Sequence, residues 1–76
     1  MQRTVVLDSQ DPLIHSNRGD ADNQLEQYEK ALKNFNKALE LDPKFAVAYK
    51  NRANVYQALG RSQEAKADMA KWKSLR

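Results

Sequence analysis

Apolar residues recur at helical spacing along most of the chain, most clearly between residues 27 and 41. There the apolar positions lie three or four residues apart, which places them on one side of a helix. These positions are Tyr28, Ala31, Leu32, Phe35, Ala38 and Leu39. Asp42-Pro43 follows, and proline cannot continue a helix and disfavours helical angles in the residue before it. The pattern predicts a helix over residues 27–41.

A shorter helix is expected before it, over residues 13–24. Asp11-Pro12 supplies an N-cap side chain and then a proline at the first helical position, where its missing N–H has no cost. The apolar content of this segment is low. Asp20, Asp22 and Asn23 are poor helix formers, so the segment depends on its neighbours for stability.

Two more helices are expected in the second half of the chain. Residues 45–59 have apolar side chains on one face and precede Gly60, a residue that commonly follows a helix. Ser62 is then the expected N-cap of the last helix. The inward stripe of that helix is Ala65, Met69 and Trp72. No strand pattern appears, and the short connections predict antiparallel helix pairs.

The whole pattern repeats with a period of 34 residues, so that Asn17-Arg18 recurs as Asn51-Arg52. Other identical pairs at this separation are Leu25 and Leu59, Ala31 and Ala65, Lys37 and Lys71, and Leu41 and Leu75. A fixed period of this length is typical of helix–turn–helix units that stack side by side. On the same register Leu7-Asp8 corresponds to Leu41-Asp42. Residues 1–11 are therefore a tail or the remnant of a preceding helix, with residues 3–8 as its last turns.

Size and composition exclude several classes of protein. Seventy-six residues form one small domain at most, and two repeat units bury little surface. The net charge of +3 comes from 13 Lys and Arg interspersed with 10 Asp and Glu, which favours a solvated helical surface over a nucleic-acid site. The absence of cysteine excludes disulfides and cysteine zinc sites. Without a signal-peptide pattern or an apolar run near ~20 residues, we expect a cytoplasmic protein with no membrane span.

The residues offer little support for catalysis, a cofactor or a metal. With one histidine and no cysteine, Cys–His nucleophile pairs cannot be assembled. His15 occupies a helix-packing position that is Tyr49 in the second copy, so a structural role is favoured. A calcium loop starting at Asp20 fails, because its sixth position is Leu25 rather than glycine and its twelfth is Ala31 rather than glutamate.

Residues 12–76 resemble the tetratricopeptide repeat family. The strongest stretch is residues 28–43, YEKALKNFNKALELDP. The first copy matches the family pattern at His15, Gly19, Ala31, Phe35, Ala38 and Pro43, and the second at Tyr49, Ala53, Tyr56, Gly60, Ala65 and Met69. The resemblance implies an all-α fold of four helices, two stacked repeats over residues 12–45 and 46–76, in a fragment of a right-handed solenoid.

Such stacks bind partners on a concave surface lined by the first helix of each pair. In this chain the predicted groove comprises Leu13, Ser16, Asp20, Asn23, Gln24, Val47, Lys50, Asn54, Gln57 and Ala58. One subfamily holds the carboxylates of heat-shock chaperone tails with a Lys and an Asn four residues apart. Lys50 and Asn54 match that pair, but Ser16 and Asp20 do not, so a complete clamp is not expected.

Two departures from the family pattern bear on the first helix pair. Asp22 stands where the second copy has Tyr56, and we expect its carboxylate to reach solvent or to pair with Arg18. Glu26 replaces the turn glycine matched by Gly60. A left-handed backbone would cost a residue other than glycine about 1 kcal/mol. Fusion of the first two helices into one, which would favour a swapped dimer, stays an alternative.

These observations predict a non-enzymatic module that binds a protein or peptide in the groove. The alternative is a structural role, in which the chain forms a homodimer by end packing or helix exchange. A self-association edge would comprise Met69, Trp72 and Leu75. The chain is also compatible with a fragment of a longer repeat scaffold. Nucleic-acid binding by the basic last helix is the third and least favoured interpretation, because Glu64 and Asp68 interrupt its charges.

Overall fold

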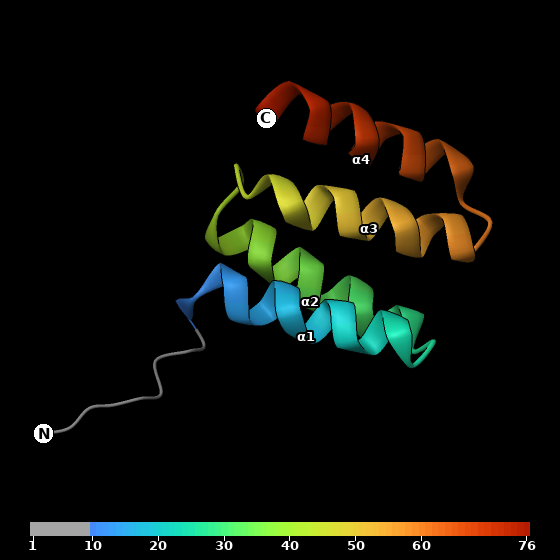
Figure 1. The fold of residues 1–76 in the computed structure, drawn as a ribbon, viewed down its shortest axis with the longest axis horizontal. Helices are drawn as coiled ribbons and strands as arrows, with labels where there is room; N and C mark the ends of the chain where they lie inside the picture. The colour runs from blue at the N-terminus through green and yellow to red at the C-terminus, as the bar shows by residue number, and fades with distance from the viewer. Residues whose placement is uncertain (1–9) are drawn as a thin grey trace, which may run out of the picture.

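The structure is a computed structural model that describes residues 10–76. Its four helices are α1 (Pro12–Gln24), α2 (Tyr28–Leu41), α3 (Ala46–Ala58) and α4 (Ser62–Leu75). Figure 1 shows them side by side in chain order, each antiparallel to the one before. α1 packs on α2 and α3 packs on α4, while α2 also packs on α3 and joins the two pairs. The all-α prediction is confirmed, and residues 10–76 contain no strand.

α2 provides most of the core, with an apolar stripe that packs on both α1 and α3. Ala31, Phe35 and Ala38 have no exposed surface, and Leu32 and Leu39 are nearly as buried. The same cluster includes Ala48 and Val55 of α3. By contrast, α4 buries only Ala65 and Asp68, so Met69 and Trp72 of its predicted inward stripe are only partly buried.

The connection between α1 and α2 forms the same turn as the connection between α3 and α4. Glu26 has a φ of 60° and Gly60 a φ of 77°, both in the left-handed region. In the first turn the Gln27 N–H donates to the Asp22 carbonyl at 2.8 Å, and in the second the Arg61 N–H donates to the Tyr56 carbonyl at 2.8 Å. This pattern closes a helix end by satisfying its last carbonyls. The helices therefore stay separate at Glu26, and the fusion alternative is wrong.

The helix starts agree with the sequence in one case and differ in another. The Asp11 carboxylate accepts a hydrogen bond from the Leu13 N–H at 2.9 Å, and Pro12 begins α1, as predicted. Ser62 was expected to cap α4 but is its first helical residue, and Arg61 holds the cap position without a side-chain bond. α4 thus starts one residue earlier than a serine cap would require, since a cap at Ser62 would make Gln63 the first helical residue. The expectation for residues 3–8 lies outside the described residues.

Candidate functional site

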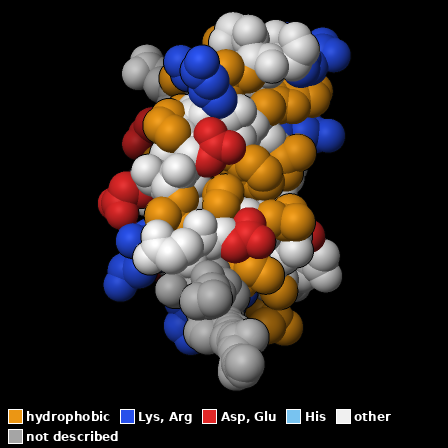
Figure 2. Space-filling model, turned by 90° about the vertical axis from the view of Figure 1, so that its left-hand side faces the viewer, with side chains coloured by type: hydrophobic (Ala, Val, Ile, Leu, Met, Phe, Trp, Pro, Cys, Tyr) orange, Lys and Arg blue, Asp and Glu red, His pale blue; other side chains and the backbone are white. Residues whose placement is uncertain are grey.

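The predicted groove residues lie on α1 and α3, two helices that also touch each other. Two of the large exposed hydrophobic residues belong to this set: Leu13 is 50% exposed and Val47 is 48% exposed. They occupy equivalent positions in the two repeats, near the start of their helices. Figure 2 looks onto the end of the molecule where α1 and α3 begin, and apolar side chains appear there from bottom to top between polar ones. The repeat thus places matched apolar side chains in solvent on its first helices.

The polar members of the set are mostly exposed as well. Asp20, Gln24, Lys50, Asn54 and Gln57 lie in solvent. The Gln24 amide donates to the Asp20 carboxylate at 3.4 Å, so these two side chains hold each other along α1. The remaining members are Asn23, which is partly buried, and Ala58, which is exposed. The face offers amide and ammonium donors on α3 and a carboxylate on α1.

Ser16 does not belong to this face, because its exposed fraction is only 2%. Its repeat equivalent Lys50 is exposed, since a long side chain reaches past its neighbours to water. Ser16 is short and lies one turn before Gly19, on the side of α1 that meets the Phe35 ring. The burial of Ser16 contradicts its assignment to an exposed groove, because its short side chain, unlike that of Lys50, does not reach water.

Trp72 lies between two cations at the end of the stack. The Lys50 ammonium is 5.1 Å from the centre of its ring and the Arg76 guanidinium is 4.6 Å away. Contacts of this length between a cation and an aromatic face are attractive. The other members of the predicted edge, Met69 and Leu75, are partly buried like Trp72 itself. The indole therefore helps to position the Lys50 side chain.

A partly buried ion pair, extended by one hydrogen bond, connects three of the helices. Arg52 of α3 donates through Nε and Nη2 to the two oxygens of Asp68 on α4, at 2.8 and 2.7 Å. Its Nη1 donates to the Asn36 side chain of α2 at 2.7 Å. Tyr49 and Tyr56 flank the guanidinium, with ring centres 5.5 and 5.8 Å away. The hydrogen bond with Asp68 raises the pKa of Arg52, an effect that burial partly opposes. The arrangement is a structural clamp.

The sequence did not predict this clamp, because Asp68 stands among the basic residues of the last helix and its partner lies on another helix. Its side chain is only 8% exposed. Two signals were present. Asn51-Arg52 repeats Asn17-Arg18, and Asp68 follows the buried Ala65 by three residues, on the same side of α4. Because an arginine recurs at positions 18 and 52, an acidic or amide partner is expected at a second recurring position, such as Asn34 and Asp68.

Between α1 and α2 there is a hollow of about 470 Å³. Its lining residues are Arg18, Ala21, Asp22, Lys30, Lys33 and Asn34, none of which belongs to the predicted groove. Asp22 accepts a hydrogen bond from the Asn34 amide at 2.8 Å, a partner that the sequence did not suggest. Asp22 stands where the second repeat has the Tyr56 ring. The carboxylate of Asp22 is smaller than that ring, and it lies in the lining of the hollow.

The helix pairs, the period and the shared turn geometry agree with comparisons to known protein families. A family described as "TPR repeat" matches residues 19–60, and one described as "Tetratricopeptide repeat" matches residues 46–75. The chain belongs to the tetratricopeptide repeat family. Tetratricopeptide repeats generally mediate protein–protein interactions and generally have no enzymatic activity of their own.

Two similar proteins have the tetratricopeptide repeat in their names. The chain is 38% identical over 66 residues to the human "Tetratricopeptide repeat protein 28", a match that covers 87% of this chain and 3% of that protein. It is 33% identical over 63 residues to the "Small glutamine-rich tetratricopeptide repeat-containing protein 2" of Mycosarcoma maydis, covering 83% of this chain and 18% of the relative. The tetratricopeptide unit described here thus corresponds to a small part of each relative.

Other kinds of site find little support in the described part of this tetratricopeptide chain. His15 is 9% exposed and packs inside the first repeat, in the position expected for a structural residue. Among residues 10–76, His, Asp and Glu side chains do not gather in groups of three that could hold a metal ion. In the same range, no helix has the length and apolar content that a membrane span requires.

Proposed function

We propose that this chain binds an extended peptide of a partner protein across the exposed face of α1 and α3. The observation that carries the proposal is the matched pair Leu13 and Val47, which are about half exposed at equivalent positions of the two repeats. A large aliphatic side chain in solvent at one position is ordinary, but its recurrence on adjacent first helices is typical of a surface that contacts a partner.

Polar side chains beside these two residues would orient the peptide. Lys50 and Asn54 are exposed one turn apart on α3, and Gln57 follows on the same helix. An ammonium and amides at this spacing can donate hydrogen bonds to peptide carbonyls or to a carboxylate. Contact with Trp72 limits the rotamers of Lys50, which lowers the entropy lost when a ligand is bound. The peptide class that fits is therefore apolar with at least one acidic group.

The proposal is tested by selecting peptides from a random displayed library against the full chain and measuring their affinities by fluorescence anisotropy. Lys50→Glu should weaken acidic peptides at least about tenfold, because an attraction becomes a repulsion. Leu13→Ser and Val47→Ser should weaken apolar ones. Lys30→Glu, an exposed change on α2, is the matched control and should leave affinity unchanged. Selected peptides that bind every variant equally would refute the assignment to α1 and α3.

A second candidate is self-association, which one specific observation favours. Leu25 is 68% exposed, whereas its repeat equivalent Leu59 is partly buried against the core. Sedimentation equilibrium over a concentration series distinguishes the two functions. A dimer that Leu25→Glu converts to a monomer would put assembly first. A monomer at all concentrations would leave peptide binding as the function.

A further inference from the structure

The outward face of α4 differs from the corresponding face of α2 in a way that suggests a second binding surface. α2 packs on α3 through a side that includes Leu32, Asn36 and Leu39. Each of these positions has an equivalent 34 residues later on α4. The equivalents are Lys66, Ala70 and Lys73, all of them exposed. Two apolar contacts of the helix stack are therefore replaced by lysines.

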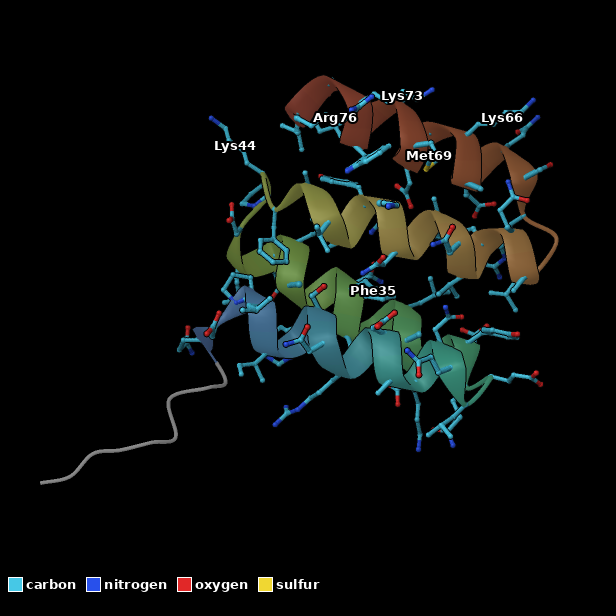
Figure 3. All side chains as sticks on the ribbon, viewed as in Figure 1. Phe35, Lys44, Lys66, Met69, Lys73 and Arg76 are labelled. Atoms are coloured by element: carbon cyan, nitrogen blue, oxygen red, sulfur yellow. The ribbon has the colours of Figure 1, made fainter. Side chains whose placement is uncertain are left out.

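The two lysines point away from the rest of the molecule. Figure 3 shows Lys66 and Lys73 on the outer edge of α4, on the opposite side from α3. They lie two helical turns apart, about 10 Å, with the small Ala70 between them. Seven residues also separate Ala48 from Val55, the buried side chains of α3 that share a cluster with Leu32 and Leu39. The face of α4 thus has the spacing that accepts a helix, with charge at its two contact points.

The positive charge on this part of the surface is not balanced within the described residues. Of the two carboxylates on α4, Glu64 lies 3.9 Å from Arg61 and Asp68 is buried against Arg52. Over residues 10–76, this leaves three lysines of α4 and its C-cap arginine without an acidic partner: Lys66, Lys71, Lys73 and Arg76. In Figure 2 the uppermost charged side chains are all Lys or Arg.

We propose that this face of α4 docks an acidic amphipathic helix of a partner protein, in the position that a following helix of the stack would take. The partner helix places two carboxylates seven residues apart on Lys66 and Lys73, with a small or apolar residue over Ala70. The partly buried Trp72 stands where α2 has the fully buried Ala38, and it bounds the site on the side of Lys50. The proposal goes beyond peptide binding on α1 and α3, since neither lysine belongs to that face.

The geometry favours a helix over a nucleic acid as the occupant. Single-stranded nucleic acids bind by stacking bases on open aromatic rings beside a track of cations. The Trp72 ring is already in contact with Lys50 at 5.1 Å and Arg76 at 4.6 Å, so it is not an open platform. The paired spacing of Lys66 and Lys73 matches side chains on a helix, two turns apart.

The test uses a peptide made from residues 45–59 with Ala48→Glu and Val55→Glu, held helical by a side-chain bridge on its outer face. A matched control peptide carries Lys at both positions. Trp72 is the one tryptophan in the chain and the peptides contain none, so its fluorescence reports binding directly. The full chain should bind the Glu peptide saturably, with a Kd below about 1 mM, and the Lys peptide at least tenfold more weakly. Amide shifts should map the contact to Lys66, Ala70 and Lys73.

Charge reversal decides the outcome. In the double variant Lys66→Glu, Lys73→Glu the preference should exchange, so that the Lys peptide binds and the Glu peptide does not. The control variant Lys30→Glu, Lys33→Glu on α2 should behave as the unmodified chain, and helicity by circular dichroism verifies that both variants fold. The proposal is overturned if the unmodified chain binds neither peptide or both equally, or if reversal leaves the preference unchanged. Displacement of the Glu peptide by a uridine 12-mer that binds more tightly would also overturn it.

Discussion

Replacing Gly19 by alanine should destabilise this chain, although the same change is favourable in most helices. Gly19 lies inside α1, where alanine is generally better than glycine by about 1 kcal/mol. Here an added Cβ would lie 2.7 Å from Cε1 and 2.9 Å from Cδ1 and Cζ of Phe35, where ordinary contacts are 3.4 to 4 Å. The methyl group would meet the face of a ring that has no exposed surface.

The size of the effect follows from two opposing contributions. The ring would have to retreat by at least 0.7 Å, from 2.7 to 3.4 Å, inside a fully enclosed site. Overpacking of this kind costs about 1–3 kcal/mol, and an enclosed ring belongs in the upper part of that range. The gain in helix propensity of about 1 kcal/mol offsets part of it. We expect Gly19→Ala to lower the free energy of unfolding by about 1–2 kcal/mol.

The second repeat supplies the compensating change. Its equivalents of Gly19 and Phe35 are Ala53 and Met69. Alanine, which is larger than glycine, is thus paired with methionine, which is more flexible than phenylalanine. Phe35→Met should cost less than about 1.5 kcal/mol alone. In the double variant the thioether should move away from the new methyl, and the total loss should be smaller than the sum of the single losses by about 1 kcal/mol.

Urea unfolding followed by far-UV circular dichroism gives the four free energies of this cycle. Ala70→Gly, an exposed change within α4, measures the helix-propensity contribution in the same chain and should cost about 1 kcal/mol. If Gly19→Ala is as stable as the unmodified chain or more so, the ring accommodates the methyl group and the packing argument is wrong. Strict additivity of the two changes would show that the side chains do not interact.

Two further predictions concern the clamp and the turns. Asp68→Ala should lower the free energy of unfolding by about 2–3 kcal/mol. This is below the full cost of breaking a buried pair, because the Arg52 side chain keeps 19% of its surface exposed. A loss under about 1 kcal/mol in urea unfolding would show that the clamp contributes no more than a surface ion pair. Glu26→Gly should stabilise the chain by about 1 kcal/mol, since Glu26 has a φ of 60°, and Gly60→Ala, at a φ of 77°, should destabilise it by a similar amount. A calorimetric Tm that moves the same way for both changes would contradict this.

Much of the fold could be predicted from sequence because its determinants are local and repeated. The apolar stripe of α2 fixes one helix and its buried side, and the 34-residue period transfers that assignment to α4. Gly60 marked one turn plainly. Glu26 marked the equivalent turn only through the register, because its own side chain gives no left-handed preference. The period therefore identified a turn that residue type alone would have missed.

The site was less predictable because its features arise from differences between the repeats. Exposure of Lys50 did not imply exposure of Ser16, since the two side chains differ in reach. The partner of Arg52 lies 16 residues away on another helix, and its counterpart in the first repeat is an asparagine that binds Asp22 instead. Equivalent backbone positions thus carry different polar contacts, which only the packed side chains reveal.

The two outer faces of the stack differ, and the difference limits how copies of this chain could associate. Ala21 of α1 and Leu25, its C-cap residue, are exposed. Their equivalents Val55 of α3 and Leu59, the C-cap of α3, pack against the core, so the α1 face resembles an uncovered packing surface. The α4 face carries Lys66 instead. Head-to-tail association would press its ammonium group and that of Lys73 onto this apolar surface, and an unpaired buried charge is strongly unfavourable. Any homodimer should therefore use α1 in both copies, which leaves α4 available to an acidic partner.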